Sequence, residues 1–294
     1  LKYYTDTETV KLQSVDALGR PMNCTYELNV KDNVAIIELA SCSGIAMLDI
    51  HERDPLVTST YGTGLQVQHA IQQGVKKILL GIGGSATNDA GIGILSAMGF
   101  VFLDSDGETL EPLGKALIQI SEIIPPDPLP SVQFDVACDV NNPLYGPEGA
   151  AFVFSEQKGA THAEAKLLDE GLRTFASVVM QQTGKDISSF PGAGAAGGIA
   201  AGLAAYLPVN IIEGTQLVLD ASKIERSLTG TAIIITGEGK IDHQSFRGKT
   251  ISAISSIAGK HNIPVIAFCG KLELDKTQWK KLGLMDAVEI SDGS

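Results

Sequence analysis

The sequence is poor in cysteine. Its 294 residues include four cysteines, none of them in a Cys-x-x-Cys pair: Cys24, Cys42, Cys138 and Cys269. Zinc knuckles and redox dithiols need such close pairs, and a secreted disulfide framework needs a higher density of cysteines. The sequence therefore predicts neither, and it favours a reducing compartment, which we expect to be the cytoplasm.

Long hydrophobic runs are also missing. No apolar stretch of the chain approaches the roughly 18 residues that a membrane-spanning helix requires. No basic segment followed by an apolar one opens the sequence, so we expect neither a secretory signal nor a membrane partner. The chain begins at Leu1 and stops soon after the strand-like residues 287–290, and from this we expect both ends to be cut.

Basic residues are outnumbered by acidic ones. Lysine and arginine together number 22 against 34 aspartates and glutamates, which gives a formal net charge of −12 at pH 7. An acidic surface repels the phosphate backbone of nucleic acids and anionic membrane surfaces. The composition argues against nucleic acid as a partner, and a small anionic substrate would need local basic groups.

Glycine, by contrast, is abundant, with 32 residues, and hydrophobic residues make up 44% of the chain. Tight turns between apolar segments are typical of a soluble α/β protein. The pattern predicts β structure over residues 1–39, then strands alternating with helices, and no complete helix after residue 268. Later strands are predicted at residues 77–80, 100–103, 132–138, 232–236 and 265–268, and helices at 64–73, 90–98, 161–183, up to 206, and 251–260.

The first candidate site is the glycine loop GGSATND, residues 83–89, between a predicted strand and a predicted helix. Glycines let the backbone approach a ligand, and the first N–H groups of a helix are unpaired, so this order is typical of anion-binding loops. The hydroxyl, amide and carboxylate groups suit a polyol or an organic acid, and Asp89 suits Mg²⁺. Capping of the next helix by Thr87, Asn88 or Asp89 would explain one of these residues but not all.

Two further candidates follow the predicted strand at residues 132–138. Asp139 stands at the carboxyl end of that strand, where it suits a general base or a metal ligand, although Asp-Val-Asn-Asn-Pro is also ordinary turn chemistry. Lys158 stands just ahead of a helix N-terminus, where its charge opposes the helix dipole. Its side chain is therefore expected either to point to solvent or to help hold an anion.

Two more glycine-rich segments carry candidates. The glycines of residues 191–198 would permit the approach of a phosphate, although close helix packing explains the pattern slightly better. The segment TGEGKID follows a predicted strand and carries Glu238, Lys240 and Asp242, with Arg247 beyond it. These opposed charges indicate either a salt-bridged surface loop or a site for a phosphorylated anion with metal, and we favour the site.

A dinucleotide-binding fingerprint is one alternative. Gly81-x-Gly83-x-x-Ala86 fits it, and the acidic Asp104 ends the predicted strand at residues 100–103, so a nicotinamide-dependent dehydrogenase is one hypothesis. The pattern is weakly specific in a glycine-rich chain, and nothing upstream builds the first half of a Rossmann domain. A non-catalytic ligand-binding fragment is another alternative, which predicts binding without turnover.

Taken in order, several segments resemble the bacterial type of glycerate kinase. They run over nearly the whole chain, so the resemblance rests on far more than one glycine loop. The segments are ELASCSGI (38–45), RDPL and TSTYG (53–62), GIGGSATNDAG (81–91), CDVNNPL (138–144), QKGA (157–160), PGAGAAGG (191–198) and GEGKID (237–242). The resemblance places the first glycine loop in a site for glycerate and ATP, and not for NAD.

The resemblance implies a reaction and a fold. The reaction is transfer of the γ-phosphoryl group of ATP to a hydroxyl of D-glycerate with Mg²⁺; which hydroxyl reacts is left open, as is the oligomeric state, a homo-oligomer included. The fold is a two-domain α/β architecture, with an inserted α/β domain over residues 18–230 and a partial Rossmann-like domain from residues 1–17 and 231–294. The family's opening strand and helix and its closing helical segment have no counterpart in this sequence.

The resemblance also places the candidate residues at the cleft between those domains. Phosphoryl transfer needs the reacting groups held in line, their charge neutralised and the attacking hydroxyl deprotonated. We expect Asp89, Asp139 and Asp242 to share the base and metal roles, with Asp89 and Asp139 as metal ligands, and Lys158 and Lys240 to hold phosphate or carboxylate. The residues expected to bind substrate or phosphate are Gly83, Gly84, Ser85, Thr87, Asn88, Gly194, Gly197, Glu238 and Arg247.

Overall fold

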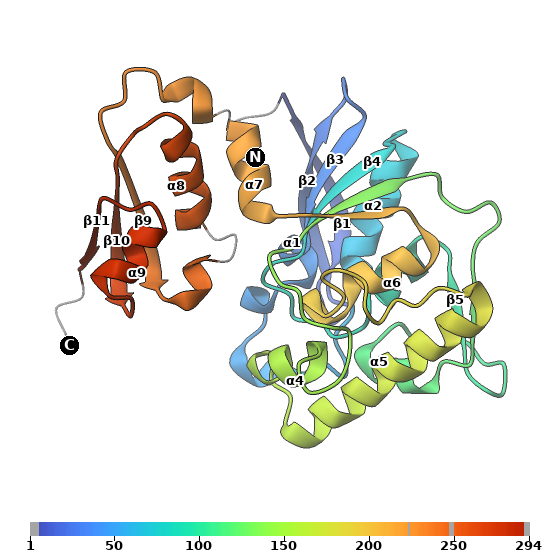
Figure 1. The fold of residues 1–294 in the computed structure, drawn as a ribbon. Coiled ribbons are helices and arrows are strands. Elements are labelled where there is room, and N and C mark those ends of the chain that lie inside the picture. Colours follow the sequence, from blue (N-terminus) through green and yellow to red (C-terminus); the bar gives the residue numbers. More distant parts are fainter. Residues whose placement is uncertain (1–5, 223, 247–249, 291–294) are drawn as a thin grey trace. The chain divides into compact units, whose positions relative to one another are not determined.

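The computed structural model describes residues 6–222, 224–246 and 250–290. The chain divides by its contacts into two units, Asp6–Ile212 and Glu213–Ser294, and each is described by itself (Figure 1). Both units combine helices with parallel strands, which confirms the expected two-domain α/β class. Within the described residues, no helix has both the length and the apolar character that crossing a membrane requires.

The larger unit is built on a six-stranded sheet with the order β1-β2-β3-β4-β7-β8. The first three strands are antiparallel neighbours, and β3, β4, β7 and β8 run parallel. The strands are β1 (Glu8–Val15), β2 (Pro21–Asn29), β3 (Val34–Glu38), β4 (Lys77–Gly81), β7 (Gln133–Ala137) and β8 (Val209–Ile212). The predicted β structure at the start of the chain is confirmed.

Burial follows from this pairing. The middle residues of β4 and β7 are buried on both faces of the sheet, as parallel strands covered by helices require. Strand β1 instead alternates, with Val10, Leu12 and Ser14 turned inward and their neighbours exposed. The main hydrophobic core of the unit includes Ile37, Leu80, Ile94, Phe134 and Phe175, and a small separate cluster is formed by Ala17, Leu48 and Ala86.

Helices surround this sheet, and short 3₁₀ helices join them. The longest, α5, begins at the predicted capping box, where the Thr161 hydroxyl accepts the Glu164 N–H, and ends at Gly184 with a φ of +72°. The helices are α1 (Ala40–Ser43), α2 (Tyr61–Gln72), α3 (Ile92–Ala97), α4 (Ala150–Phe154), α5 (His162–Thr183) and α6 (Ile199–Tyr206). The 3₁₀ helices are η1 (Ile45–Met47), η2 (Ile50–Glu52), η3 (Gly114–Gln119), η4 (Glu156–Lys158) and η5 (Ala195–Gly197).

The strand predicted at residues 77–80, the helix at 90–98 and the strand at 100–103 would together make a βαβ unit, and that interpretation is wrong. Strand β5 (Val101–Leu103) pairs antiparallel with β6 (Glu122–Ile124) in a separate two-stranded sheet. Strand β4 already has a parallel neighbour on each side, β3 on one and β7 on the other, so neither of its edges is open to β5.

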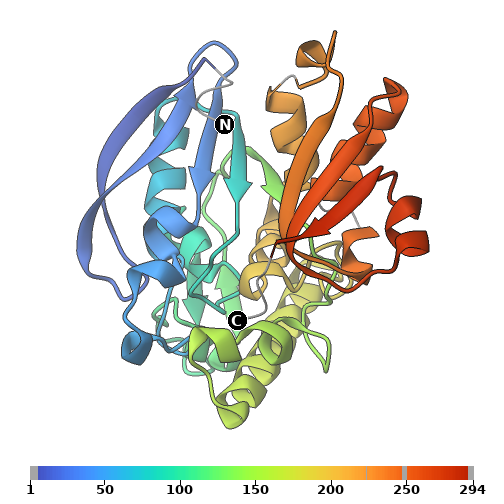
Figure 2. The same ribbon diagram turned by 90° about the vertical axis from the view of Figure 1, so that its left-hand side faces the viewer.

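The smaller unit holds a three-stranded parallel sheet with the order β11-β10-β9, drawn in orange and red in Figure 2. Its core includes Ile251, Val265, Ala267, Trp279 and Leu282. The elements are α7 (Gly214–Ser222), η6 (Ile224–Ser227), β9 (Ile234–Ile241), η7 (His243–Phe246), α8 (Thr250–Lys260), β10 (Val265–Leu272), α9 (Lys276–Lys281) and β11 (Asp286–Glu289).

Two predictions for this unit are corrected. Strand β9 continues past residue 236, so Glu238 and Lys240 lie in the strand and not in a loop after it. Backbone pairing with β10 extends the ladder beyond the apolar run from which the strand was predicted. A further helix, α9, does follow residue 268: it is too short for a hydrophobic period, and it is capped by Asp275, which accepts the N–H groups of Thr277 and Gln278.

The predicted domain boundaries differ from this division by contacts. Residues 6–17 belong to the larger unit, since β1 pairs along its whole length with β2. Residues 213–230, which include α7, belong to the smaller unit. The predicted boundaries mark where one domain is inserted into another in the family fold, whereas the division by contacts marks compact units. The predicted assignment therefore stays a prediction.

Candidate active site

Three segments that carry polar residues lie at one edge of the larger unit's sheet. Because β3, β4 and β7 are parallel neighbours, the segments that follow them begin at the same, carboxyl edge. These segments are residues 39–44, the glycine loop at residues 82–91, and residues 138–146. The carboxyl edge is where open α/β sheets bind ligands, so the structure brings the first two predicted loops together at the expected place.

The glycine loop is anchored by other parts of the chain. The Ala86 N–H donates to the Ser43 carbonyl at 2.9 Å, and the Ala86 carbonyl accepts the Thr58 hydroxyl at 3.0 Å. The Ala90 N–H donates to the Gly197 carbonyl at 2.9 Å. These contacts fix the second half of the loop, whereas Gly83 and Gly84 at its start remain exposed.

Asp89 is completely buried in this loop. One carboxylate oxygen accepts the N–H and hydroxyl of Thr60 at 2.8 and 2.7 Å and the Gly93 N–H at 3.4 Å, and the other accepts the Gly91 N–H at 3.1 Å. Burial raises the pKa of the carboxyl, and these four donors oppose that rise. Both oxygens are engaged within the protein, so the contacts favour an anchoring role; the base and metal roles of Asp89 stay predictions.

The sequence reasoning missed Thr60, the partner of Asp89. Thr60 precedes α2, and its hydroxyl donates to Asp89 while accepting the Ile94 N–H at 3.1 Å, so it joins the starts of two helices. The segment TSTYG offered a signal, since consecutive hydroxyl residues before a helix commonly bond to backbone groups. That signal does not say which backbone groups they reach.

Lys158 points inward, not to solvent. Its side chain is 3% exposed, and its ammonium donates to the Thr87 carbonyl at 2.6 Å. Burial lowers the pKa of the ammonium to about 8, against the opposing effect of the Asp89 charge. Of the two alternatives drawn from the sequence, pointing to solvent is wrong, and the holding of an anion stays a prediction.

The burial of Lys158 gives stability a dependence on pH. Its pKa falls from 10.5 to about 8 on folding, and a lowered lysine pKa contributes stability that is complete above the unfolded value and is lost as the pH falls through the folded one. The free energy of unfolding of the wild type, relative to Lys158→Met, should rise by roughly 3 kcal/mol between pH 8 and 10.5. Urea titrations at several pH values test this, and an unchanged difference would contradict a buried charge.

The glycine-rich segment at residues 191–198 contacts both the glycine loop at residues 82–91 and the loop after β7. The Gly194 N–H donates to the Asn142 carbonyl at 2.8 Å, in the loop after β7. A Cβ atom on Gly194 would lie 2.3 Å from the Pro143 carbonyl oxygen, and one on Gly197 would lie 2.4 Å from the Thr87 carbonyl oxygen. Close packing therefore accounts for both glycines, and their binding of substrate or phosphate stays a prediction.

The remaining polar residues of these loops differ in exposure. The hydroxyls of Ser85 and Thr87 lie 3.0 Å apart and are buried. The Asn88 amide is fully buried, and neither its nitrogen nor its oxygen has a hydrogen-bond partner among the described residues. Asp139 is exposed at the carboxyl edge, directly after β7. Of the two predicted metal ligands, Asp139 is thus exposed and Asp89 is buried; the metal roles stay predictions.

Two of the predicted site residues in the smaller unit, Lys240 and Asp242, take part in ion pairs. The Lys240 ammonium lies 2.8 Å from Glu273 and 3.5 Å from Asp242, and Glu238 accepts the Ser245 hydroxyl at 3.4 Å. The two lysines beside it lower the pKa of Glu273 to about 2. This is the salt-bridged surface that the sequence offered as an alternative; the catalytic and binding roles stay predictions. Arg247 lies outside the described residues.

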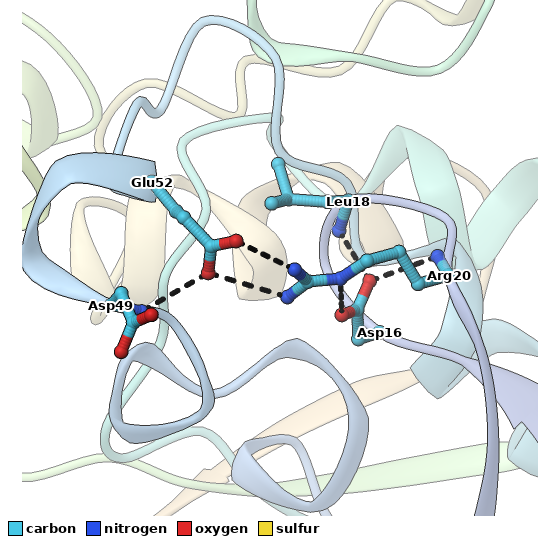
Figure 3. A network of polar contacts seen from close by, with 5 residues as sticks. All are labelled: Asp16, Leu18, Arg20, Asp49 and Glu52. Carbon is cyan, nitrogen blue, oxygen red and sulfur yellow. Dashed lines mark hydrogen bonds and ion pairs between the residues drawn. The ribbon is translucent and has the colours of Figure 1, made fainter.

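An ion network fixes the chain just before Arg53 (Figure 3). Arg20 donates through Nε to Asp16 at 2.5 Å and through Nη1 to Glu52 at 2.7 Å. Glu52 also accepts the Asp49 N–H at 3.1 Å, which closes the capping box of η2. These contacts tie the turn between β1 and β2 to the segment that leads into Arg53.

The dinucleotide alternative loses its support. Asp104 directly follows β5, which does not belong to the parallel sheet, and its carboxylate accepts the Asp106 and Glu108 N–H groups at 2.9 Å each. A Rossmann site requires that acid on the strand beside the glycine loop's own strand. The fold instead defines an α/β protein whose polar segments converge at the carboxyl edge of its sheet, where such proteins bind small molecules.

The chain belongs to the glycerate kinase family, whose model matches residues 1–294. A glycerate kinase from Halalkalibacterium halodurans is 43% identical over 263 residues, covering 87% of this chain and 68% of that protein. The glycerate 2-kinase of Escherichia coli is 38% identical over 88% of this chain and 68% of its own length. A crystal structure described as glycerate kinase 2 from Salmonella typhimurium LT2 has a TM-score of 0.81 at 36% identity, covering 98% of this chain and 76% of that one.

Proposed function

We propose that this protein is a glycerate kinase, which transfers the γ-phosphoryl group of ATP to a hydroxyl of D-glycerate. The bond from the γ-phosphorus to the β-phosphate bridging oxygen breaks, a bond to the glycerate oxygen forms, the hydroxyl proton passes to a base, and ADP leaves. The convergence of helix α1 and two polar loops at the carboxyl edge, in a chain matched by the family model along its whole length, carries this proposal.

The residues fit a reaction that depends on positioning and charge more than on covalent catalysis. The exposed backbone of Gly83 and Gly84 suits phosphate oxygens, and the buried second half of the loop holds that backbone in place. Mg²⁺ commonly binds through one or two carboxylates plus substrate phosphates. Asp139 fits this mode, and no described group of three or more His, Cys, Asp or Glu side chains forms a metal cage. When bound, the ion would neutralise charge on the phosphates.

Several finer points belong to the same proposal. The name of the Escherichia coli relative favours the 2-hydroxyl as the acceptor. The formal charge of −12 argues against nucleic acid as a partner, and we propose a cytoplasmic enzyme with D-glycerate as its partner, for which a homo-oligomer is one possible state. The predicted roles of Glu238, Lys240 and Asp242, which lie in the partial Rossmann-like domain, are part of the same proposal.

D-Glycerate-dependent release of ADP from Mg-ATP tests the activity, and phosphorus NMR of the product separates the 2-phosphate from the 3-phosphate. NAD binding without ADP release would restore the dehydrogenase hypothesis. Glycerate binding without turnover would instead favour a ligand-binding fragment. A 3-phosphate product would contradict only the choice of hydroxyl.

Asp139→Asn tests the predicted base and metal role. We expect kcat to fall at least 100-fold at saturating Mg-ATP, because the carboxylate that meets the ion or the hydroxyl proton is lost. Its exposure predicts little change in unfolding temperature. Asp242→Asn is the parallel test in the smaller unit, and unchanged turnover in both variants would remove the assignment.

A further inference from the structure

Lys158 carries a buried charge at the edge of the glycine loop. Burying an ammonium ion is costly unless hydrogen bonds compensate for the lost water. The bond to the Thr87 carbonyl, at 2.6 Å, is the contact that its ammonium makes in the described part of the chain. It makes no ion pair within 4 Å there, so ordinary salt-bridge stabilisation does not explain why a lysine lies in this position.

The Thr87 carbonyl lies between the exposed start and the buried end of the glycine loop. Thr87 stands between the exposed Gly83 and Gly84 and the buried anchor Asp89, and the fully buried Asn88 follows it directly. Contacts on Ala86 and Asp89 fix the loop on both sides of Thr87. The bond from Lys158 fixes the carbonyl between them, and with it the orientation of the Thr87–Asn88 peptide.

The backbone next to Lys158 is fixed by its own contacts. It ends η4, and the next residue, Gly159, has a φ of +99° and packs so closely that a Cβ atom there would lie 1.9 Å from the Arg53 carbonyl oxygen. The segment that leads into Arg53 is fixed by the network of Arg20 and Glu52 (Figure 3). The Lys158 side chain therefore reaches the glycine loop from a backbone whose position is fixed.

We propose that Lys158 is a positioning residue for phosphoryl transfer, which acts through the Thr87 carbonyl on the glycine loop and does not touch the substrate. This rests on the proposed function for its effect on turnover. Its burial and inward direction separate it from the exposed Gly83 and Gly84, where ligand approach is open. The step that it assists is the in-line alignment of phosphate and acceptor, which small displacements disturb strongly.

Lys158→Met is the first test, because methionine is similar in length and provides no donor. We expect kcat per folded molecule to fall about 100-fold, the effect of misplacing a catalytic loop by about 1 Å. The KM values for glycerate and ATP should stay within about threefold, since substrate contacts are retained. Lys185→Met is the matched control: Lys185 also donates to a backbone carbonyl, that of Ala204 at 3.4 Å, but on the surface. We expect its kinetics to be those of the wild type.

Two outcomes would overturn the proposal. A KM for glycerate or ATP that rises at least tenfold with kcat retained would make Lys158 a substrate ligand. A lower unfolding temperature with kcat per folded molecule retained would make it a structural residue only. If Lys158→Met does not fold, Lys158→Gln takes its place. Its amide nitrogen lies one bond nearer the backbone than the lysine Nζ, so we expect it to leave the Thr87 carbonyl without this donor, and the same two criteria apply.

Hydrogen exchange measured without substrate separates this proposal from the proposed function. The Ala86 and Ala90 N–H groups bond across the loop, to Ser43 and Gly197. We expect peptides covering residues 82–91 to exchange at least tenfold faster in Lys158→Met, with α8 unchanged. Absent glycerate-dependent ADP release in the wild type would count against the kinase function alone. Unchanged exchange in the loop would count against the action of Lys158.

Discussion

Asp89→Asn is expected to destabilise the larger unit by about 3 kcal/mol, the order of magnitude for buried donors left unpaired, and to abolish turnover. The aspartate accepts backbone N–H groups at both oxygens, from Thr60 and Gly93 at one and from Gly91 at the other. An asparagine must place its NH₂ group at one of these positions. In either orientation a donor then meets a donor inside a fully buried site.

Thermal unfolding and ADP release measured on the same samples test this result. We expect the unfolding temperature to fall by roughly 9 °C. Asp104→Asn is the matched control, because Asp104 also accepts two backbone N–H groups, but with one oxygen and in a more exposed turn. An amide satisfies that arrangement through its own oxygen. Lost turnover with unchanged stability in Asp89→Asn would contradict the anchoring role and restore the base or metal role.

The parts of the fold that the sequence predicts well are those with a local cause. The capping residues Thr161 and Glu164 and the terminal Gly184 define α5 within one segment, and the apolar run at residues 77–80 defines β4. These signals depend on neighbours within a few residues, so the sequence contains them directly. The convergence of the loops after β4 and β7 follows from the same parallel pattern.

The parts that the sequence does not predict depend on distant segments. Nothing near Phe102 indicates that β5 pairs with β6 rather than with the parallel sheet. The neighbours of Lys158 leave open whether its charge points to solvent or helps to hold an anion, and its buried contact is with Thr87, far away in the sequence. The hydrogen bond between Thr60 and Asp89 also joins segments that are far apart in the sequence. The sequence indicated the polar chemistry of the glycine loop, but it did not show which side chains point into the protein and which point to solvent.

Gly197→Ala is expected to have a larger effect on folding than its size suggests. Gly197 has a φ of +76°, a left-handed conformation that costs a non-glycine residue about 1–2 kcal/mol. An added Cβ would lie 2.4 Å from the Thr87 carbonyl oxygen and 2.5 Å from the Asn88 Cα, and both are backbone atoms that cannot turn aside. The glycine loop would have to move, and the bond from the Ala90 N–H to the Gly197 carbonyl would be lost.

The control for this substitution is Gly184→Ala. Gly184 has a φ of +72°, but nothing lies within 4 Å of an added Cβ, so the same backbone strain occurs without the collision. We expect Gly184→Ala to lower the free energy of unfolding by about 1 kcal/mol and Gly197→Ala by at least 3 kcal/mol, the range of core overpacking added to strain. Urea titration gives both values. If Gly197→Ala is no less stable than Gly184→Ala but raises the KM for ATP, then the glycine is kept for ligand approach and the packing explanation is wrong. A clearly larger stability loss in Gly197→Ala than in Gly184→Ala shows instead that residues 191–198 act by packing against the glycine loop at residues 82–91.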